Sequence, residues 1–316
     1  MAAGFRLLWL NCSIHIEATT SLTHREVLIV DGSTLEALFR KLKALEALPR
    51  GTLAGKMCTV IDLASRLPRY VWFTDVAQAH DTHFLEPVLK VSRRGTLWIV
   101  DRGFYDFGFF EQVIGRGAAW ITRSKSNLAY RVSQVLEQSD FIHDRLVWIE
   151  GCRYPLRLVE VRFERQWYRY LTSVVDPRVL PAAVVADLYR RRWRIEEAFL
   201  IVKRVLNLSY LWTGSENGVL LQVWSTWLFF AVLVDLGDAV AEELRIEFDR
   251  ISLEMLIRGL YHFSVAYQKG LADDPVKYFA APENRDLGVV KRIRKKRPSA
   301  ADPPPLKEDL TTLGFA

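Results

Sequence analysis

Three acidic residues, Asp31, Asp101 and Glu196, stand in settings that suit carboxylate chemistry. Asp31 ends an apolar run at 27–30, and Asp101 ends a similar run at 97–100. Both are predicted to be strand-end carboxylates, at the sheet edge where open α/β folds bind ligands. Together with a helical glutamate, they form the kind of set that holds two hard divalent cations about 4 Å apart. An aspartate that caps a turn leaves the same local pattern.

The third carboxylate lies in the segment DLYRRRWRIEEAFLIVKRVLN at 187–207, which has no Gly or Pro and is predicted to be one helix. At about 100° per residue, one narrow face of this helix carries its reactive side chains. They are Tyr189, Arg192, Glu196 and Lys203. An adjoining apolar sector, which includes Ile195, would seat the helix on a core. A solvated face with an Arg192/Glu196 pair one turn apart is the alternative.

These residues resemble the DDE transposases of bacterial insertion sequences, in the group called insertion-sequence family four. That family carries a first Asp after a hydrophobic strand and a second in a segment like VDRGFYDFGFFEQV, found here at 100–113. Its signature is Tyr, two residues, Arg, three residues, Glu, six residues, Lys, a spacing that the four residues of the helix face reproduce. The likeness extends to AQAHDTHFLEPVL and WITRSKSN, and it covers most of residues 26–235.

The resemblance implies that Asp31, Asp101 and Glu196 are catalytic and bind two Mg²⁺ or Mn²⁺ ions. It also implies that four other side chains meet DNA: Tyr189, Arg192 and Lys203 at the DNA end, and Trp193, which stands where some members stack an aromatic on a flipped base. As a core tryptophan, Trp193 needs no such role. The implied partners are terminal inverted repeats and target DNA, with a homodimer on paired ends, and no nucleotide cofactor.

The elements that must position these residues are predicted from periodicity. Strands are expected near 26–31, 57–63, 69–76, 96–100 and 118–123, and helices near 82–91 and 106–115. The stretch 128–175, rich in Val, Tyr, Trp and Arg, predicts a small β-rich insertion before the Glu196 helix. This order suits an α/β fold with a ribonuclease H-like mixed sheet flanked by helices. The chain is then expected to be mostly helical to about residue 270.

The predicted organisation has three parts. Residues 1–25 form a short leader, 26–280 form the catalytic domain, and 281–316 form a basic, Pro-rich tail that includes KRIRKKR at 291–297. The tail either adds salt-sensitive DNA affinity or only aids solubility. Relatives usually carry a sizeable DNA-binding region before the first Asp, which is expected to be missing here because only thirty residues precede Asp31.

Composition favours a globular protein with a polyanionic partner, since 43 basic residues stand against 37 acidic ones for a formal net charge of +6. The three cysteines are dispersed and odd in number, which argues against disulfides and a zinc knuckle. The N-terminus makes a poor signal peptide, so a cytoplasmic bacterial protein, nucleoid-associated when on DNA, is expected. The apolar stretch 219–234 is predicted to be a buried core helix and not a membrane span.

Two local patterns are set aside. GTLAGKM at 51–57 has too few residues between its glycines for a phosphate-binding loop. His80, Asp81 and His83 could suggest zinc, but a helix-start role for Asp81 with surface histidines is favoured. Three functions remain open: a transposase, a ribonuclease H-like nuclease without strand transfer, and a truncated, non-catalytic DNA-binding remnant.

Overall fold

The structure is a computed structural model, and it describes residues 26–35, 55–76, 78–163, 165–208 and 216–290. The leader, the basic run at 291–297 and most of the 51–57 loop lie outside these residues. The contacts group the chain into two units, whose described parts are chiefly 26–34 with 56–195 and then 196–290. The division into a leader, a catalytic domain at 26–280 and a tail stays a prediction.

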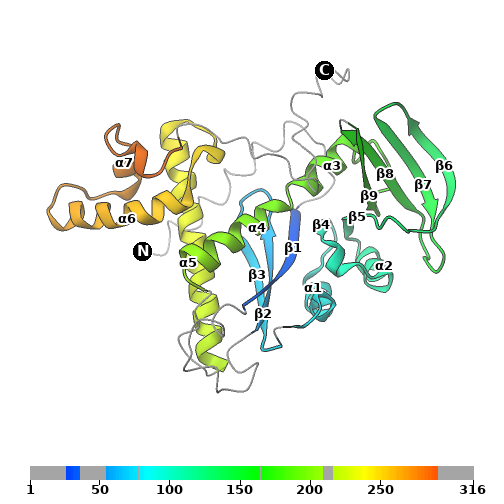
Figure 1. The fold of residues 1–316 in the computed structure, drawn as a ribbon, viewed down its shortest axis with the longest axis horizontal. Coiled ribbons are helices and arrows are strands. Elements are labelled where there is room, and N and C mark those ends of the chain that lie inside the picture. The colour runs from blue at the N-terminus through cyan, green and yellow to red at the C-terminus, as the bar shows by residue number, and fades with distance from the viewer. Residues whose placement is uncertain (1–25, 36–54, 77, 164, 209–215, 291–316) are drawn as a thin grey trace. The chain divides into compact units, whose positions relative to one another are not determined.

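A nine-stranded mixed sheet forms the first unit, in the order β3-β2-β1-β4-β5-β9-β8-β7-β6 (Figure 1). Its first five strands are β1 (Glu26–Thr34), β2 (Lys56–Asp62), β3 (Pro68–Thr74), β4 (Thr96–Val100) and β5 (Ala119–Arg123). Strand β4 pairs in parallel with β1 on one side and with β5 on the other. On the other edge of β1, β2 pairs antiparallel with β1, and β3 pairs antiparallel with β2. The predicted strands are therefore present, but β1 continues three residues beyond Asp31.

The stretch predicted to be β-rich does contain strands, and these extend the same sheet. Its strands form an antiparallel meander: β6 (Arg131–Gln138), β7 (Ile142–Trp148), β8 (Leu156–Phe163) and β9 (Gln166–Thr172). The last of them pairs with β5. Arg157 of β8 is fully buried, with its Nη2 atom 2.5 Å from Asp144 Oδ2 of β7. A buried arginine needs such a partner because the cost of desolvating its charge is large.

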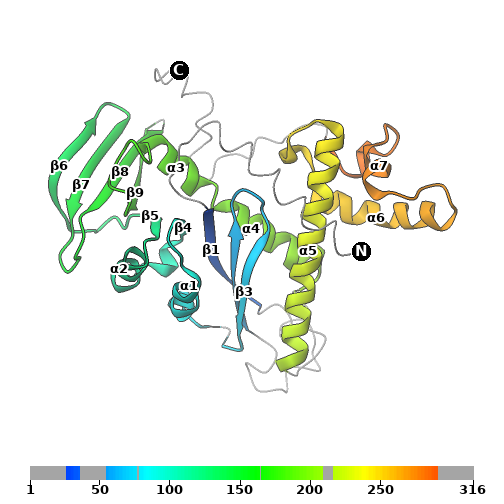
Figure 2. The same ribbon diagram turned by 180° about the vertical axis from the view of Figure 1, so that it is seen from behind.

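Strand alternation gives the central sheet two different faces. One face is apolar and packs on two helices that lie side by side, α1 (Leu85–Val91) and α2 (Phe107–Gly115) (Figures 1 and 2). Here Phe110 of α2 stacks on Trp120 of β5, with ring centroids 4.0 Å apart. Asp31 is out of phase with the residues of this face, Leu28 and Val30, so its side chain points to the opposite face. That opposite face meets α3 (Ala182–Arg190).

The predicted single helix over 187–207 was wrong, because three segments replace it. The first, α3, ends at Arg190, and α4 (Trp193–Leu200) is followed by a π-helical turn (Ile201–Val205) that contains Lys203. In the intervening turn, the Arg192 N–H donates to the Tyr189 carbonyl at 3.1 Å, a three-residue spacing tighter than that of an α-helix. The residues at 190–192 are arginines, which are good helix formers, so periodicity gives no sign of the break.

The second unit is helical. It contains α5 (Glu216–Leu244), α6 (Leu253–Gln268) and α7 (Pro275–Ala280), with 3₁₀ turns at Phe248–Arg250 and Arg285–Leu287. Its core includes Val240, Leu256 and Phe279. Residues 281–290, assigned to the tail from sequence, still pack here, since Val289 forms a β-bridge with Ile251.

The prediction of a buried core helix at 219–234 is right for one face of α5 and wrong for the other. Val223, Trp227 and Leu233 are buried. Five large apolar side chains of the same helix are instead 42–69% exposed: Leu221, Trp224, Leu228, Phe229 and Val232. Among the described residues, one helix, Asn217–Leu244, is long and apolar enough to cross a membrane by length and composition, and a core helix of a soluble protein meets the same criteria.

Candidate active site

Asp31 and Asp101 follow directly on paired residues of two adjacent parallel strands. The last pair of the β1–β4 ladder is Val30 with Val100, and each valine is followed by one of the aspartates. Because the strands run in the same direction, both carboxylates leave the sheet at the same level. The two candidate residues that sequence placed at strand ends are thus brought together in the first unit.

Arg192 lies between the two aspartates. Its Nη1 atom is 2.5 Å from Asp31 Oδ2, and its Nε atom is 3.7 Å from Asp101 Oδ1. Arg192 and Asp31 are both buried, whereas Asp101 is more accessible. One guanidinium therefore lies close to two carboxylates and offsets part of their mutual repulsion.

Tyr189 supplies a hydroxyl to the same group, since its OH donates to Asp101 Oδ1 at 3.2 Å. Burial, followed by the neighbouring Asp101 charge, raises the pKa of the Tyr189 phenol well above its ordinary value. The hydroxyl therefore remains protonated and able to donate at neutral pH. Its ring packs on Tyr170 of β9, with centroids 5.4 Å apart, which fixes the position of the phenol.

The turn-cap interpretation does not account for these aspartates. Asp101 precedes the 3₁₀ turn Arg102–Phe104, but its side chain makes no capping hydrogen bond to that turn. Asp31 accepts a hydrogen bond from the Gly32 N–H at 2.8 Å with one oxygen, while the other oxygen binds Arg192. Both carboxylates are thus directed at least partly toward the Arg192 guanidinium.

The remaining predicted site residues have different settings. Trp193 begins α4, is 40% exposed, and has its ring 5.4 Å from the Arg192 guanidinium carbon. Glu196 on α4 and Lys203 in the π-helical turn belong to the second unit. The group assembled within the first unit therefore consists of Asp31, Asp101, Tyr189 and Arg192.

The donor atoms of this group fit a hard divalent cation. Asp31 and Asp101 offer carboxylate oxygens, which Mg²⁺ and Mn²⁺ prefer, and they already converge on one positive group. Within the described part of the chain, no group of three or more His, Cys, Asp or Glu side chains is close enough to hold a metal. The role of Glu196 as the third carboxylate stays a prediction.

A fourth acidic residue, Asp81, adjoins the site and was assigned only a helix-start role from sequence. It does begin the 3₁₀ turn Asp81–Phe84, but His80 caps that turn by accepting from the Thr82 N–H. The Asp81 carboxylate instead contacts Gly32 and Gly103, the glycines that follow the two candidate aspartates. The sequence signal for this contact was a glycine shortly after each aspartate.

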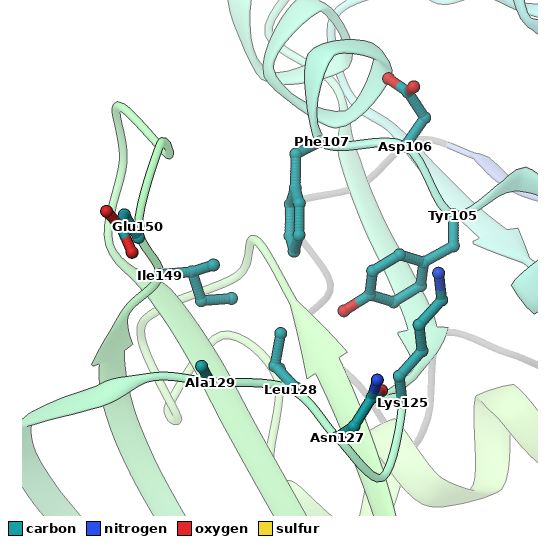
Figure 3. A pocket seen from close by; sticks show the side chains of 9 residues that line it. All are labelled: Tyr105, Asp106, Phe107, Lys125, Asn127, Leu128, Ala129, Ile149 and Glu150. Carbon is teal, nitrogen blue, oxygen red and sulfur yellow. The ribbon is translucent and has the colours of Figure 1, made fainter.

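A hollow of about 480 Å³ opens beside the segment that follows Asp101 (Figure 3). Its lining includes Tyr105, Phe107, Lys125, Asn127 and Glu150. Figure 3 shows the Tyr105 hydroxyl pointing into this space. The hydroxyl is buried and has no hydrogen-bond partner within the part of the chain that the structure describes, while Lys125 Nζ lies 4.5 Å from the Tyr105 ring centroid. Aromatic faces beside a lysine suit a stacked base and its phosphate.

Fold and site together define an α/β protein with a carboxylate site on its central parallel strands. Residues 22–231 match the family described as the transposase DDE domain, and because the match covers more than half of the chain, the chain belongs to this family. The resemblance first drawn from the aspartates and the Tyr/Arg/Glu/Lys spacing is thereby confirmed.

Curated relatives agree with this assignment. The chain is 28% identical over 194 residues to a putative transposase, y4zB, of Sinorhizobium fredii, covering 58% of this chain and 54% of the relative. It is 24% identical over 219 residues to the transposase InsG for insertion sequence element IS4 of Escherichia coli, covering 63% and 49%. It is 23% identical over 163 residues to a probable transposase for element IS5377 of Geobacillus stearothermophilus, covering 49% and 43%. The chain thus spans about half the length of these relatives.

Proposed function

We propose that this chain carries out metal-dependent DNA cleavage at insertion-sequence ends and joins those ends to target DNA. The observation that carries the proposal is the placement of Asp31 and Asp101 directly after paired residues of adjacent parallel strands. It occurs in a chain that belongs to the transposase DDE domain family. The mixed sheet with its central parallel strands supports a ribonuclease H-like fold for the domain.

In this proposal, Asp31, Asp101 and Glu196 are the catalytic residues and hold two Mg²⁺ or Mn²⁺ ions. Such ions, when bound, activate a water or a 3′-hydroxyl and stabilise the leaving oxygen. The protein's part is to present oxygen donors from rigid elements, and strands β1 and β4 do so for the two aspartates. Glu196 lies on α4, four residues after Arg192, which is in the turn that precedes this helix.

Arg192 and Tyr189 would act on both the carboxylates and the DNA. Asp31 and Asp101 would hold the cation with the oxygens that now face Arg192, and the Arg192 guanidinium would then be available to a phosphate. Tyr189 orients Asp101 through its hydroxyl. Trp193, with its exposed indole, is available to stack on a base, and Lys203 adds a point charge for a phosphate.

The hollow lined by Tyr105, Phe107 and Lys125 would hold part of the bound DNA. Tyr105 and Phe107 offer aromatic surfaces, and Lys125 offers a cation. The partners are then the terminal inverted repeats and target DNA, with two protomers on paired ends, in the cytoplasm of a bacterium. Neither a nucleotide cofactor nor a membrane has a part in the proposal.

The test is Mn²⁺-dependent cleavage and joining of DNA that bears the inverted repeats flanking the gene. Wild type is compared with Asp31→Asn and Glu196→Gln, and binding is recorded by band shift. Glu197→Gln is the matched control, because Glu197 is the next residue on the same helix and is exposed. Joined products should disappear in the two site variants and persist in the control. The band shift should be the same for all four proteins.

Two other outcomes would favour the alternatives. Cleavage without joining by wild type would indicate a ribonuclease H-like nuclease. A band shift without cleavage by wild type and variants alike would indicate a non-catalytic DNA-binding remnant of a transposase.

A further inference from the structure

The Asp81 carboxylate is wedged between the two glycines that follow the candidate metal ligands. A Cβ atom on Gly32 would lie 2.1 Å from Asp81 Oδ1, and a Cβ atom on Gly103 would lie 2.1 Å from Asp81 Oδ2. Each oxygen therefore occupies the space that any larger residue would need. One side chain thus contacts the end of β1 and the segment after β4 at the same time.

Backbone conformation does not explain these two glycines. Glycine is required where φ is positive, yet neither Gly32 nor Gly103 is among the positive-φ glycines of the described residues. The close approach of Asp81 accounts for both positions. The glycines and Asp81 therefore form one packing unit, although they come from three separate segments.

Lys56 holds Asp81 in this position. Its Nζ atom forms an ion pair with Asp81 Oδ1 at 2.7 Å and donates a hydrogen bond to the Ala79 carbonyl at 2.7 Å. Its Cε atom would lie 3.0 Å from a Cβ on Gly32, so the lysine stem is packed against that glycine. Both charged side chains are largely buried, which makes an accurately placed pair necessary.

Asp81 contacts Gly32 on the face of β1 opposite to the one that the Asp31 carboxylate faces. Gly32 is in phase with Leu28 and Val30, on the face of β1 that meets α1, whereas Asp31 points to the face that meets α3. Asp81 therefore presses on the backbone from the side opposite to the Asp31 carboxylate. Asp81 therefore supports the backbone of both segments that carry the aspartates.

We propose that Asp81, held by Lys56, is a positioning residue that sets the separation of the Asp31 and Asp101 carboxylates and thereby the affinity of the site for a divalent cation. The inference rests on the proposed function, in which these two aspartates hold the cation. It assigns Asp81 no direct contact with the cation or with DNA.

Mn²⁺ binding to the isolated protein tests this inference without any dependence on catalysis. Free Mn²⁺ is measured by electron paramagnetic resonance during titration of wild type, Asp81→Ala, Asp81→Asn and Asp31→Asn. Asp81→Ala should weaken Mn²⁺ binding by about tenfold to a hundredfold, the usual effect of losing a group that supports a ligand. Asp75→Ala, at an exposed aspartate, is the matched control and should bind as wild type does.

A second pair of variants separates positioning from general packing. Gly103→Ala alone should weaken Mn²⁺ binding, because its Cβ displaces the Asp81 carboxylate. In the Asp81→Ala background the two closest contacts of the added methyl group are gone, and only the Cβ atom of residue 81 remains, at 3.3 Å. The double variant should therefore bind little more weakly than Asp81→Ala alone. Asp81→Asn keeps the side-chain volume and supplies the comparison if the shorter variant fails to fold.

The outcomes distinguish this inference from the proposed function. If Asp31→Asn loses Mn²⁺ while both Asp81 variants bind it as wild type does, the positioning role is overturned and the metal site stands. Additive effects of Gly103→Ala and Asp81→Ala would also overturn it. If Asp31→Asn binds Mn²⁺ as well as wild type, the proposed metal site is wrong and the positioning role falls with it.

Discussion

Arg192 Nη1 lies 2.5 Å from Asp31 Oδ2, and both side chains are only 8% exposed. The pair joins strand β1 to the turn between α3 and α4, 161 residues further along the chain. The same guanidinium reaches Asp101, with 3.7 Å between Nε and Oδ1. The Arg192 guanidinium is therefore in direct contact with the candidate metal ligands, which links the stability of the fold to metal binding.

Replacing Arg192 with alanine should destabilise the fold strongly. The change removes one partner of a buried ion pair, a loss that typically costs about 3–5 kcal/mol in the free energy of unfolding. Urea unfolding measures the effect. Arg178→Ala, which removes an exposed arginine paired with Asp176, is the control and should leave the midpoint unchanged.

Mn²⁺ should stabilise Arg192→Ala more than it stabilises wild type. Without the guanidinium, the cation no longer competes for the oxygens of Asp31 and Asp101, so its affinity rises and the shift in unfolding midpoint grows with it. Unfolding midpoints are compared with and without Mn²⁺. Equal shifts in the two proteins would show that Arg192 and the cation do not share these oxygens.

Tyr105 should make the protein sensitive to alkali. Burial raises the pKa of its phenol from the ordinary 10.0 to about 12. Between those values, the unfolded chain loses a proton that the folded chain keeps, so stability falls as pH rises through this window and is fully retained below it. The free energy of unfolding of Tyr105→Phe should therefore fall less steeply over this range. Tyr261→Phe controls for removal of an exposed phenol.

The local sequence was sufficient to predict strands whose residues form a continuous apolar run. The apolar runs before Asp31 and Asp101 predicted two strands, and the register of β1 with β4 then brings the two aspartates together. The end of β1 could not be predicted in this way. Gly32, Ser33 and Thr34 extend the strand because they pair with β2, and that pairing partner lies in another segment.

The missed features depend on contacts between distant segments. Asp81 looked like a helix-start residue because its neighbours in sequence do form a 3₁₀ turn, while its contacts with Gly32 and Gly103 exist only in the folded chain. The break near Arg192 is likewise invisible to periodicity, since an arginine in a helix-forming run gives no sign that its side chain will bind Asp31. Hydrophobicity alone also could not show which face of α5 is exposed.

Lys125→Gln should weaken DNA binding and reduce its dependence on salt. If Lys125 meets a phosphate beside the Tyr105 ring, losing its charge should lower the slope of log affinity against log salt by about one. Fluorescence anisotropy with end-sequence DNA at several salt concentrations gives the slope. Lys90→Gln, at an exposed lysine paired with Glu86 on α1, is the control, and an equal change there would contradict a specific role for Lys125.

Arg157 should be required for the stability of the β-rich insertion. Its guanidinium is fully buried, and its Nε and Nη2 atoms bind Asp144 at 2.8 and 2.5 Å. Nη1 donates to the Leu180 carbonyl at 2.6 Å, just before α3, so the residue also ties β8 to the chain that leads to Tyr189. Arg157→Met leaves Asp144 as an unpaired buried charge and should cost about 3–5 kcal/mol in the free energy of unfolding.

Combining Arg157→Met with Asp144→Leu should recover much of that loss, because no buried charge then lacks a partner. Arg157→Lys should fall between wild type and Arg157→Met, since an ammonium keeps the charge but cannot match both carboxylate oxygens and the Leu180 carbonyl. Urea unfolding of the three variants measures these differences. If the double variant is no more stable than Arg157→Met, the loss comes from packing and from the Leu180 contact, and the Asp144 charge is not its cause.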